Sequence, residues 1–416
     1  MNFPKVVKIR QHFSGPSVAD IEAAVREQMA LSGIAGQLRP GMRVAITAGS
    51  RGIANIARII AAVVAELKAR DTRPFIVPAM GSHGGATAEG QTEVLASLGI
   101  TEESCGAPVL SSMEVMQIGE TDRGIPVYMD KYASEADATI LVGRIKVHTD
   151  FKSPIGIESG LMKMASIGLG KHKQALALHR YGIQGIRDFM PEVSRIVLAK
   201  GNILCGVAIL ENAKEETARI EVIPAGQIES RERELLRESA SLMPRLPVED
   251  IDILYVEKIG KNFSGTGMDT NIIGRMRILG AQEPASPRIK YIIASDLSEE
   301  THGNALGIGL ADITTRRLFE KIDFRKTNEN VITSTFLHRG MIPIVCENDR
   351  EAFAAALRAN WGVDPERTRF VRIANTLHLE ELYVSEPLLP ELEGLSHVEI
   401  VGDPEELKFD GQGYLI

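Results

Sequence analysis

The sequence predicts an α/β protein of two domains, each with a mainly parallel sheet flanked by helices. Strand and helix patterns alternate in the first half of the chain, which favours a parallel sheet. A second series of strand patterns begins after the Pro-containing connection at 244–247. With 416 residues the chain is also too long for one average core. We therefore expect an N-terminal domain over 1–245, a C-terminal domain over 250–375, and a tail (376–416) able to return to the first.

The N-terminal domain opens with a strand–helix–strand unit. The apolar segment RVAITA (43–48) indicates a buried strand, and residues 53–70 carry apolar side chains at helical spacing. PFIVP (74–78) indicates the next strand, and ATILV (138–142) a further one. Because these strands alternate with a helix, we expect them to lie parallel in one sheet.

The C-terminal domain shows the same alternation. Strands are expected over 252–257, 290–295 and 341–346, a helix over 350–360, and short strands over 369–373 and 382–384. Each domain also holds a Gly-rich loop, so we expect the active site in a cleft between the domains, where small-molecule sites often lie.

Composition excludes several classes of protein. Hydrophobic residues make up 44% and charged residues 25%, as in ordinary globular proteins, and the net charge of −8 argues against a nucleic-acid partner. No apolar run reaches the length of about 18 residues that a membrane span requires, and the first residues lack the apolar core of a signal peptide. The three cysteines form no CxxC pair, which favours a reducing cytoplasm and no disulfide.

Four basic residues stand out because glycines surround them. His83 lies in GSHGG, and His148, Lys163 and His179 fall within 140–182. Ser50–Arg51, His83 and His148 all follow expected strand ends, the edge where open α/β sheets bind ligands. Each residue alone also fits an ordinary role: a loop histidine, a lysine that extends to water, or a histidine at a helix end. Apolar neighbours of Lys163 would lower its pKa and make it a nucleophile.

Taken in order, the segments GSHGG, GRIKVH, SGLMK and LALH resemble the nickel-dependent lactate racemase family. The resemblance implies that His83 and His148 act as alternating acid and base. It also implies a nickel-pincer nucleotide held covalently by Lys163, with His179 as the nickel ligand. Further cofactor contacts implied by the resemblance are Ser50, Arg51 and Ser159.

Departures from the family pattern concern the substrate and the first loop. TAGSRGIAN keeps Arg51 but lacks the aspartate that the family usually has there. Ile273–Gly274 replaces a Tyr–Gln pair, which predicts a larger pocket, and Arg277 replaces a lysine. Arginine can bind a carboxylate through two hydrogen bonds. The substrate contacts expected here are Arg277, Asn271 and His302, and the substrate is expected to differ from lactate.

These observations predict a cytoplasmic isomerase that racemises or epimerises a 2-hydroxy acid by reversible hydride transfer to the tethered nickel cofactor. Its expected partners are a small hydroxy acid and the enzymes that make the cofactor, with no nucleic acid and no membrane, while an oligomer stays open. One alternative is a zinc-type hydrolase that uses His83, His148 and His179. The other is a non-catalytic carrier of the nickel nucleotide, which the missing aspartate keeps open.

Overall fold

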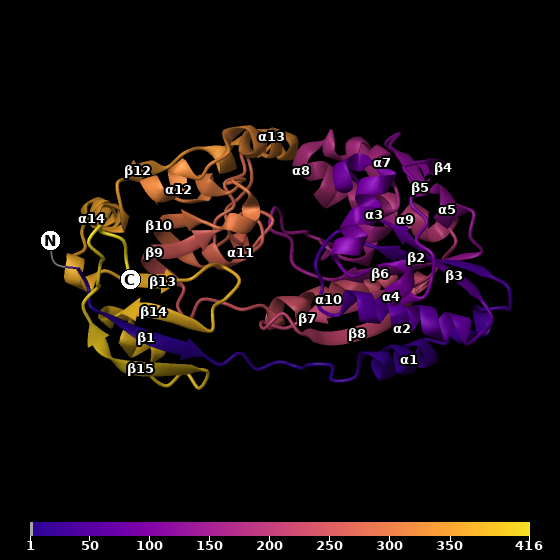
Figure 1. Ribbon diagram of the computed structural model, residues 1–416, viewed down its shortest axis with the longest axis horizontal. Helices are drawn as coiled ribbons and strands as arrows, with labels where there is room; N and C mark the ends of the chain where they lie inside the picture. The colour runs from indigo at the N-terminus through magenta and orange to yellow at the C-terminus, as the bar shows by residue number, and fades with distance from the viewer. Residues whose placement is uncertain (1–2) are drawn as a thin grey trace. The chain divides into compact units, whose positions relative to one another are not determined.

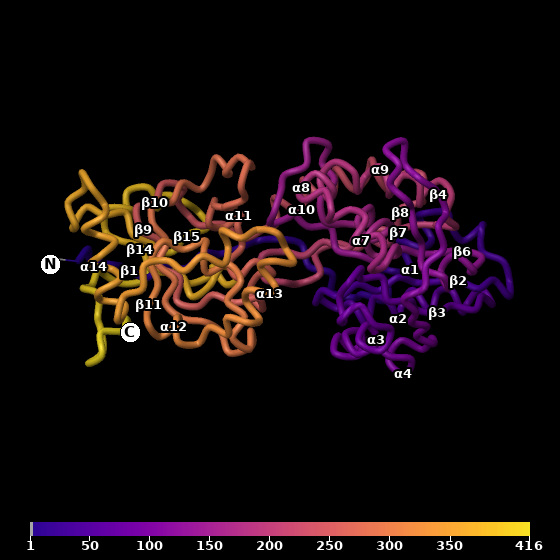
Figure 2. Tube along the Cα trace, turned by 90° about the horizontal axis from the view of Figure 1, so that it is seen from above, coloured from indigo at the N-terminus to yellow at the C-terminus, as the bar shows by residue number. Residues whose placement is uncertain are grey.

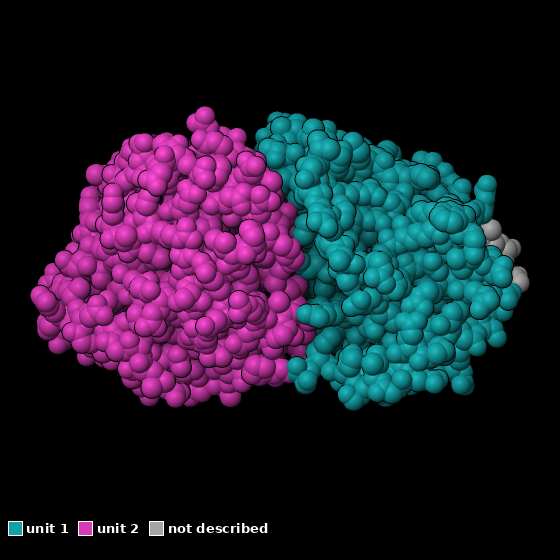
Figure 3. Space-filling model, turned by 180° about the vertical axis from the view of Figure 1, so that it is seen from behind, with its two compact units in different colours: residues 1–14, 244–416 teal, residues 15–243 magenta. Residues whose placement is uncertain are grey.

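The computed structural model describes residues 3–416 and divides the chain into two compact units. Residues 15–243 form the N-terminal unit, and the C-terminal unit combines 244–416 with the strand that precedes residue 15 (Figure 3). Each unit has a sheet rich in parallel strands with helices packed against it, so the predicted α/β fold class is confirmed.

The N-terminal unit is built on a five-stranded sheet in the order β3-β2-β6-β7-β8. The first four strands are parallel, and β8 pairs antiparallel with β7. Residues 44–48 are all buried, because a parallel strand with helices on both faces is apolar throughout. The strands of the sheet are β2 (Arg43–Ala48), β3 (Arg73–Pro78), β6 (Ala138–Arg144), β7 (Ile203–Glu211) and β8 (Thr217–Pro224).

Helices cover both faces of this sheet, so two apolar cores form. Ile46 and Val142 pack on one face with residues of α1 and α2, whereas Leu141 packs on the other with residues of α6, α9 and α10. In Figures 1 and 2, α2 and α4 lie on the opposite side of the sheet from α9. The remaining elements of the unit are α1 (Ile21–Leu31), α2 (Ile56–Lys68), α3 (Ala88–Ser97), α4 (Glu102–Cys105), the hairpin β4 (Val115–Glu120) and β5 (Pro126–Asp130), α5 (Lys131–Ser134), α6 (Leu161–Lys163), α7 (Lys171–His179), α8 (Gly182–Gln184), α9 (Met190–Lys200) and α10 (Ile228–Leu242).

The C-terminal unit has an eight-stranded mixed sheet in the order β12-β11-β10-β9-β13-β14-β1-β15. The strands from β12 to β13 are parallel, and β14, β1 and β15 continue the sheet in antiparallel pairs. The strands are β1 (Val6–Gln11), β9 (Asp250–Ile259), β10 (Arg288–Leu297), β11 (Ile313–Thr315), β12 (Ile344–Cys346), β13 (Phe370–Ile373), β14 (Glu381–Ser385) and β15 (Val398–Glu405).

Alternate side chains of β9 divide the C-terminal unit into two cores. Ile253 and Tyr255 pack with Phe353 of α14, whereas Leu254 and Val256 pack on the other face with Leu318 of α12. This alternation follows from the period of two residues along a strand. The helices of the unit are α11 (Thr270–Ile273), α12 (Arg316–Glu320), α13 (Phe324–Ser334), α14 (Asp349–Ala359) and α15 (Leu389–Leu392).

Both ends of the described chain differ from their expected placement. The sequence assigns the first residues to the N-terminal domain and lets the tail (376–416) return to it. In the structure β1 pairs with β14 on one side and with β15 on the other, so the first strand and the tail both complete the C-terminal sheet. The physical reason is that an isolated antiparallel edge exposes a full row of backbone donors and acceptors, which these two strands satisfy.

Within residues 3–416, none of the helices combines the length and the apolar character that crossing a membrane requires.

The position of β1 between β14 and β15 gives a stability prediction. Ile9 is fully buried, between Leu382 of β14 and Ile400 of β15. We expect Ile9→Ala to lower the free energy of unfolding by about 2–5 kcal/mol, because it leaves a cavity in the core. Lys8→Ala is the matched control on the same strand. Its partly exposed ion pair with Glu381 is expected to contribute less than about 1 kcal/mol. Urea denaturation measures both, and equal losses would contradict this placement of β1.

Candidate active site

The predicted site residues of the N-terminal unit lie on loops that follow the carboxyl ends of its parallel strands. Ser50 and Arg51 come directly after β2, His83 follows β3, and His148 follows β6. The strands are held in register by pairs such as Ala48 with Pro78, so their ends meet at one edge of the sheet. That edge is where α/β sheets bind ligands.

A short hydrogen bond joins the first two of these loops. The Oγ atom of Ser50 lies 2.7 Å from Nδ1 of His83. A hydroxyl group can either donate or accept, so Ser50 can hold the His83 ring in either tautomer and in its charged form. This contact orients an exposed imidazole without fixing its protonation state.

A second contact brings together two residues that are 15 positions apart. The chain leaves β6, passes His148 and returns through an isolated bridge in which the Lys146 N–H donates to the Ser159 carbonyl at 2.8 Å. The helix α6 follows at once and continues into a π-helical turn over Met164–Gly168, an irregularity often found at functional sites. As a result, Nζ of Lys163 lies 3.0 Å from Nε2 of His148.

Burial and the charged groups around Lys163 shift its pKa in opposite directions. Lys163 keeps some access to solvent, but the protein surrounds its amine, and this desolvation lowers its pKa to about 8. The carboxylate of Asp150 opposes the shift, whereas Arg51 adds to it. Crowding by protein atoms, and then the charge of Arg144, lower the pKa of Arg51, although its side chain is exposed.

His179 belongs to the same electrostatic environment. It is the last residue of α7, as the apolar helical run in the sequence predicts. Desolvation lowers its pKa, and the charge of Lys163 lowers it further, even though the ring reaches solvent. A neutral imidazole is the form that binds a transition metal. Lys163 therefore lies within hydrogen-bond distance of His148 and close enough to His179 for its charge to affect the pKa of that histidine.

Two buried carboxyl groups support this part of the chain. Glu158 accepts the backbone N–H of His148 at 2.7 Å and that of Ser153 at 3.0 Å, which fixes the loop around His148. Glu232 of α10 accepts the N–H of Met162 at 2.9 Å, at the start of α6. A Cβ atom on Gly160 would lie 2.5 Å from the Glu232 carboxyl group, so this close approach requires glycine.

A buried ion pair supports the loop that carries His83. Lys171 is fully buried, and its Nζ lies 3.2 Å from Oδ2 of Asp130 and donates to the Pro78 carbonyl and to Oε1 of Gln91. The amide group of Gln91 then donates to the carbonyls of Gly81 (3.0 Å) and His83 (3.2 Å). Burial lowers the pKa of Lys171 and raises that of Asp130, so their mutual attraction and these acceptors have to hold both charges in place.

The expected substrate contacts all lie in the C-terminal unit, where each has local partners. The N–H and the side-chain amide of Asn271 both donate to Oδ1 of Asp269 at 2.9 Å. The guanidinium of Arg277 pairs with Asp312 and donates to the Gly309 carbonyl at 2.6 Å. His302 is exposed, with a left-handed backbone, and its carbonyl accepts from Lys326.

The two positions that replace a Tyr–Gln pair are packing positions in this structure. Ile273 is fully buried in the core of the C-terminal unit. Gly274 ends α11 in the left-handed conformation, and a Cβ atom there would lie 1.9 Å from the Pro287 carbonyl oxygen. The expectation that these two substitutions enlarge a pocket is therefore wrong, because neither position has space beside it.

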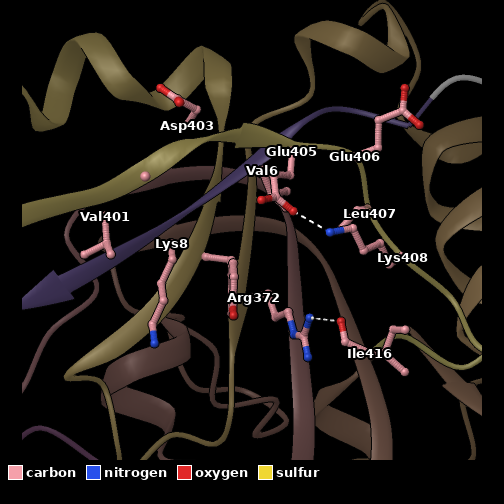
Figure 4. A pocket seen from close by; sticks show the side chains of 12 residues that line it. Val6, Lys8, Arg372, Val401, Asp403, Glu405, Glu406, Leu407, Lys408 and Ile416 are labelled. Carbon is pink, nitrogen blue, oxygen red and sulfur yellow. Dashed lines mark hydrogen bonds and ion pairs between the residues drawn. The ribbon is translucent and has the colours of Figure 1, made fainter.

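A pocket of about 290 Å³ in the C-terminal unit contains none of the predicted site residues (Figure 4). It lies against β1 and β15, where Arg372 donates to the Ile416 carbonyl at 3.1 Å. Its lining mixes basic side chains, such as Lys8 and Lys408, with acidic ones, such as Glu405. This mixture selects for neither anions nor cations.

Comparison with known proteins relates the site to one family. Residues 7–187 match the family model of the lactate racemase N-terminal domain, and this segment contains Ser50, Arg51, His83, His148, Ser159, Lys163 and His179. This segment therefore carries the lactate racemase N-terminal domain. The structure is similar to that of the lactate racemase apoprotein from Thermoanaerobacterium thermosaccharolyticum, with a TM-score of 0.54 and 12% identity. The similarity covers 87% of this chain and 92% of that one and concerns the fold. No curated protein sequence matches the chain.

Several residues that support the site have no local signal in the sequence. Lys171, Gln91, Glu158 and Glu232 look like ordinary polar residues of helices and loops. Their partners are up to 93 positions away, so pattern analysis cannot identify them. Asp150 is the exception, because it lies only two residues after His148 and its spacing alone indicates a place near that histidine.

The ion pair below the His83 loop gives a stability prediction. We expect Lys171→Met to lower the free energy of unfolding by about 3–5 kcal/mol, because it leaves the Asp130 carboxylate buried without its counter-charge. The control is Lys173→Met on the exposed side of α7, with an expected loss under about 1 kcal/mol. Chemical denaturation compares the two, and similar small losses would show that Lys171 does not hold a buried charge.

Glu232 gives a pH prediction. Burial raises its pKa to about 7, although backbone N–H groups of Met162 and Leu161 oppose the shift. Its protonated form is favoured in the folded state, so stability is highest below about pH 4.5 and falls as pH rises towards 7. We expect Glu232→Gln to gain about 3 kcal/mol relative to the native chain between pH 5 and pH 8, as measured by urea unfolding. A difference that does not change with pH would contradict this.

Proposed function

We propose that this chain racemises or epimerises a 2-hydroxy acid other than lactate by reversible hydride transfer, with a nickel-pincer nucleotide tethered to Lys163. The match of residues 7–187 to the lactate racemase N-terminal domain and the similar fold support a racemase or epimerase activity in general. The finer proposal depends on one observation. His83 and His148 follow the ends of β3 and β6, the two strands that flank β2, and a lysine of lowered pKa lies 3.0 Å from His148.

The donor groups of the N-terminal unit fit such a cofactor. Among residues 3–416 no three His, Cys, Asp or Glu side chains are grouped as a metal site. A pincer nucleotide contains its own metal-binding atoms, so the protein needs to supply only one imidazole as a metal ligand and one amine for attachment. His179 and Lys163 supply these, and both have lowered pKa values. The proposal adds Ser50, Arg51 and Ser159 as contacts to the nucleotide. When bound, the cofactor supplies a hydride acceptor.

The two histidines would move the hydroxyl proton of the substrate. Oxidation at C2 releases that proton, and a planar keto acid can then take hydride back on either face. Each enantiomer presents its hydroxyl group differently, so two bases are needed. Ser50 allows His83 to change its protonation state, as a base that alternates with an acid must.

The substrate carboxylate is assigned to Arg277, with Asn271 and His302 as further contacts. The guanidinium has five N–H groups in a planar arrangement that matches a carboxylate. In this structure those groups bind Asp312 and two backbone carbonyls, so a substrate would have to compete with Asp312. The remaining proposed partners are the enzymes that make the cofactor. A cytoplasmic location is part of the proposal, and the three cysteines are free thiols.

Activity measurement tests this function. The chain is produced together with cofactor-making enzymes and screened against 2-hydroxy acids for loss of optical rotation in deuterated water. We expect one class of acid to racemise with its C2 hydrogen retained. His83→Ala and His148→Ala should each lower turnover by roughly 10²–10⁴-fold, because each removes a proton-transfer group. His12→Ala, an exposed histidine of the C-terminal unit, is the control.

The outcomes separate the candidate functions. A Lys163 adduct without turnover of any acid would favour the nickel-nucleotide carrier. Exchange of the C2 hydrogen with solvent would contradict hydride transfer, and full activity in both histidine variants would contradict the acid–base roles.

A further inference from the structure

The hydrogen bonds of His148 define which of its ring nitrogens carries the proton. The backbone N–H of Asp150 donates to Nδ1 at 3.0 Å. A nitrogen that accepts a hydrogen bond has no proton of its own, so the ring is neutral and its proton is on Nε2. That atom faces Nζ of Lys163 at 3.0 Å. A protonated Nε2 can only donate, and Lys163 can accept only as an uncharged amine.

The opposite arrangement fits the geometry less well. A charged Lys163 would have to donate to a bare Nε2, which moves the ring proton to Nδ1. The carboxylate of Asp150 would then be the partner of Nδ1, but its Oδ2 lies 3.7 Å away, beyond hydrogen-bond distance. The backbone N–H of Asp150 would also point at a proton instead of an acceptor. The loop is held in place by Glu158, which binds the backbone of His148 and of Ser153, so it resists this change.

The other groups around Lys163 have opposing effects. Its pKa of about 8 reflects burial first, with Asp150 raising it and Arg51 lowering it. His179 is the remaining titratable neighbour, and its own lowered pKa keeps it neutral at pH 7. A hydrogen bond donated to the uncharged amine favours that form further.

We propose that His148, held as its Nε2–H tautomer by the backbone of Asp150, donates to an uncharged Lys163 and keeps this lysine ready to accept an acyl or thioacyl group. His148 thus acts as a positioning residue before any cofactor is attached. The identity of the natural acyl group rests on the proposed function, whereas the state of the amine does not.

The reaction balances without a redox partner. The lone pair of Nζ forms a bond to the acyl carbon of an activated acyl compound, and the leaving group departs with the electron pair of its own bond. Nζ then loses a proton, which passes to water because Nε2 of His148 is already protonated. The acylated nitrogen shares its lone pair with the new carbonyl or thiocarbonyl group and no longer accepts. Attachment therefore ends the hydrogen bond that Nε2–H of His148 donates to this nitrogen.

Competitive labelling with acetic anhydride tests the proposal on the full chain without cofactor or substrate. Peptide mass spectrometry follows labelling of each lysine between pH 6 and pH 10, with the exposed Lys173 as the internal reference. We expect Lys163 to titrate at or below about pH 8. At pH 7 this gives it at least roughly 100-fold more uncharged amine than a lysine of ordinary pKa has.

His148→Phe separates the hydrogen bond from burial. The ring of His148 already stacks on Phe151 at 4.5 Å, so a phenyl ring fits the same place. Loss of Nε2–H should raise the pKa of Lys163 and reduce its labelling at pH 7 by about tenfold or more, whereas burial alone predicts no loss. The control is His179→Phe, which replaces a neighbouring imidazole that shares no hydrogen bond with Lys163 within residues 3–416, and it should change labelling less than about threefold.

Two results would overturn the proposal. One is unchanged or faster labelling of Lys163 in His148→Phe, and the other is an equal loss in both variants. If His148→Phe does not fold, nitrogen NMR of histidine-labelled native chain decides, because a proton on Nδ1 of His148 is incompatible with the proposal. Racemase activity enters none of these measurements, so failure of the proposed function is recognised separately.

Discussion

The parallel pairing of β2 with β3 and β6 is the constraint on which the rest of the site depends. Because these strands run in the same direction, their carboxyl ends reach one edge, and the loops that follow must meet there. Ser50, His83 and His148 are far apart in the sequence, yet each comes within five residues of such an end. A shift of one residue in any strand would turn its side chains from one core towards the other, so the close packing of each side chain in its own core holds the register.

A layer of buried polar groups below the loops gives this edge its geometry. Lys171 and Gln91 hold the loop of His83, Glu158 holds the loop of His148, and Glu232 holds the start of α6. Each such group costs free energy when it is removed from water, and the hydrogen bonds that it makes offset that cost. Apolar residues of similar size could stabilise the unit as well. They could not hold backbone carbonyls and N–H groups in chosen positions, which is what the loops require.

Sequence patterns predicted several strands that are continuous apolar runs and missed strands of mixed polarity. The strands over 43–48, 74–78, 138–142 and 252–257 are continuous apolar runs, and each has its counterpart in β2, β3, β6 and β9. The expected strand at 341–346 is shorter, since β12 begins at Ile344. In contrast, β1 and β15 mix polar and apolar residues, and the pairing of Val6 with Glu405 spans almost the whole chain. No local pattern records a contact over that separation.

The residues of the site were likewise predicted only in part. Glycine-rich loops after strand ends pointed to His83 and His148, and the family resemblance joined Lys163 and His179 to them. Spacing alone gave no reason to expect Lys163 beside His148, because an irregular loop and a π-helical turn bring them together. The substrate side was predicted from single substitutions, and there the packing of Ile273 and Gly274 differs from expectation.

The central claim is that an uncharged Lys163 accepts a hydrogen bond from His148 at the carboxyl edge of the N-terminal sheet. Neutron diffraction from crystals of the chain in deuterated solvent at about pH 9, above the pKa of about 8 that burial gives Lys163, would observe it directly. The account predicts deuterium on Nε2 of His148, none on Nδ1, and two deuterium atoms on Nζ of Lys163. Three deuterium atoms on Nζ facing a bare Nε2, or an Nζ remote from the ring, would contradict it.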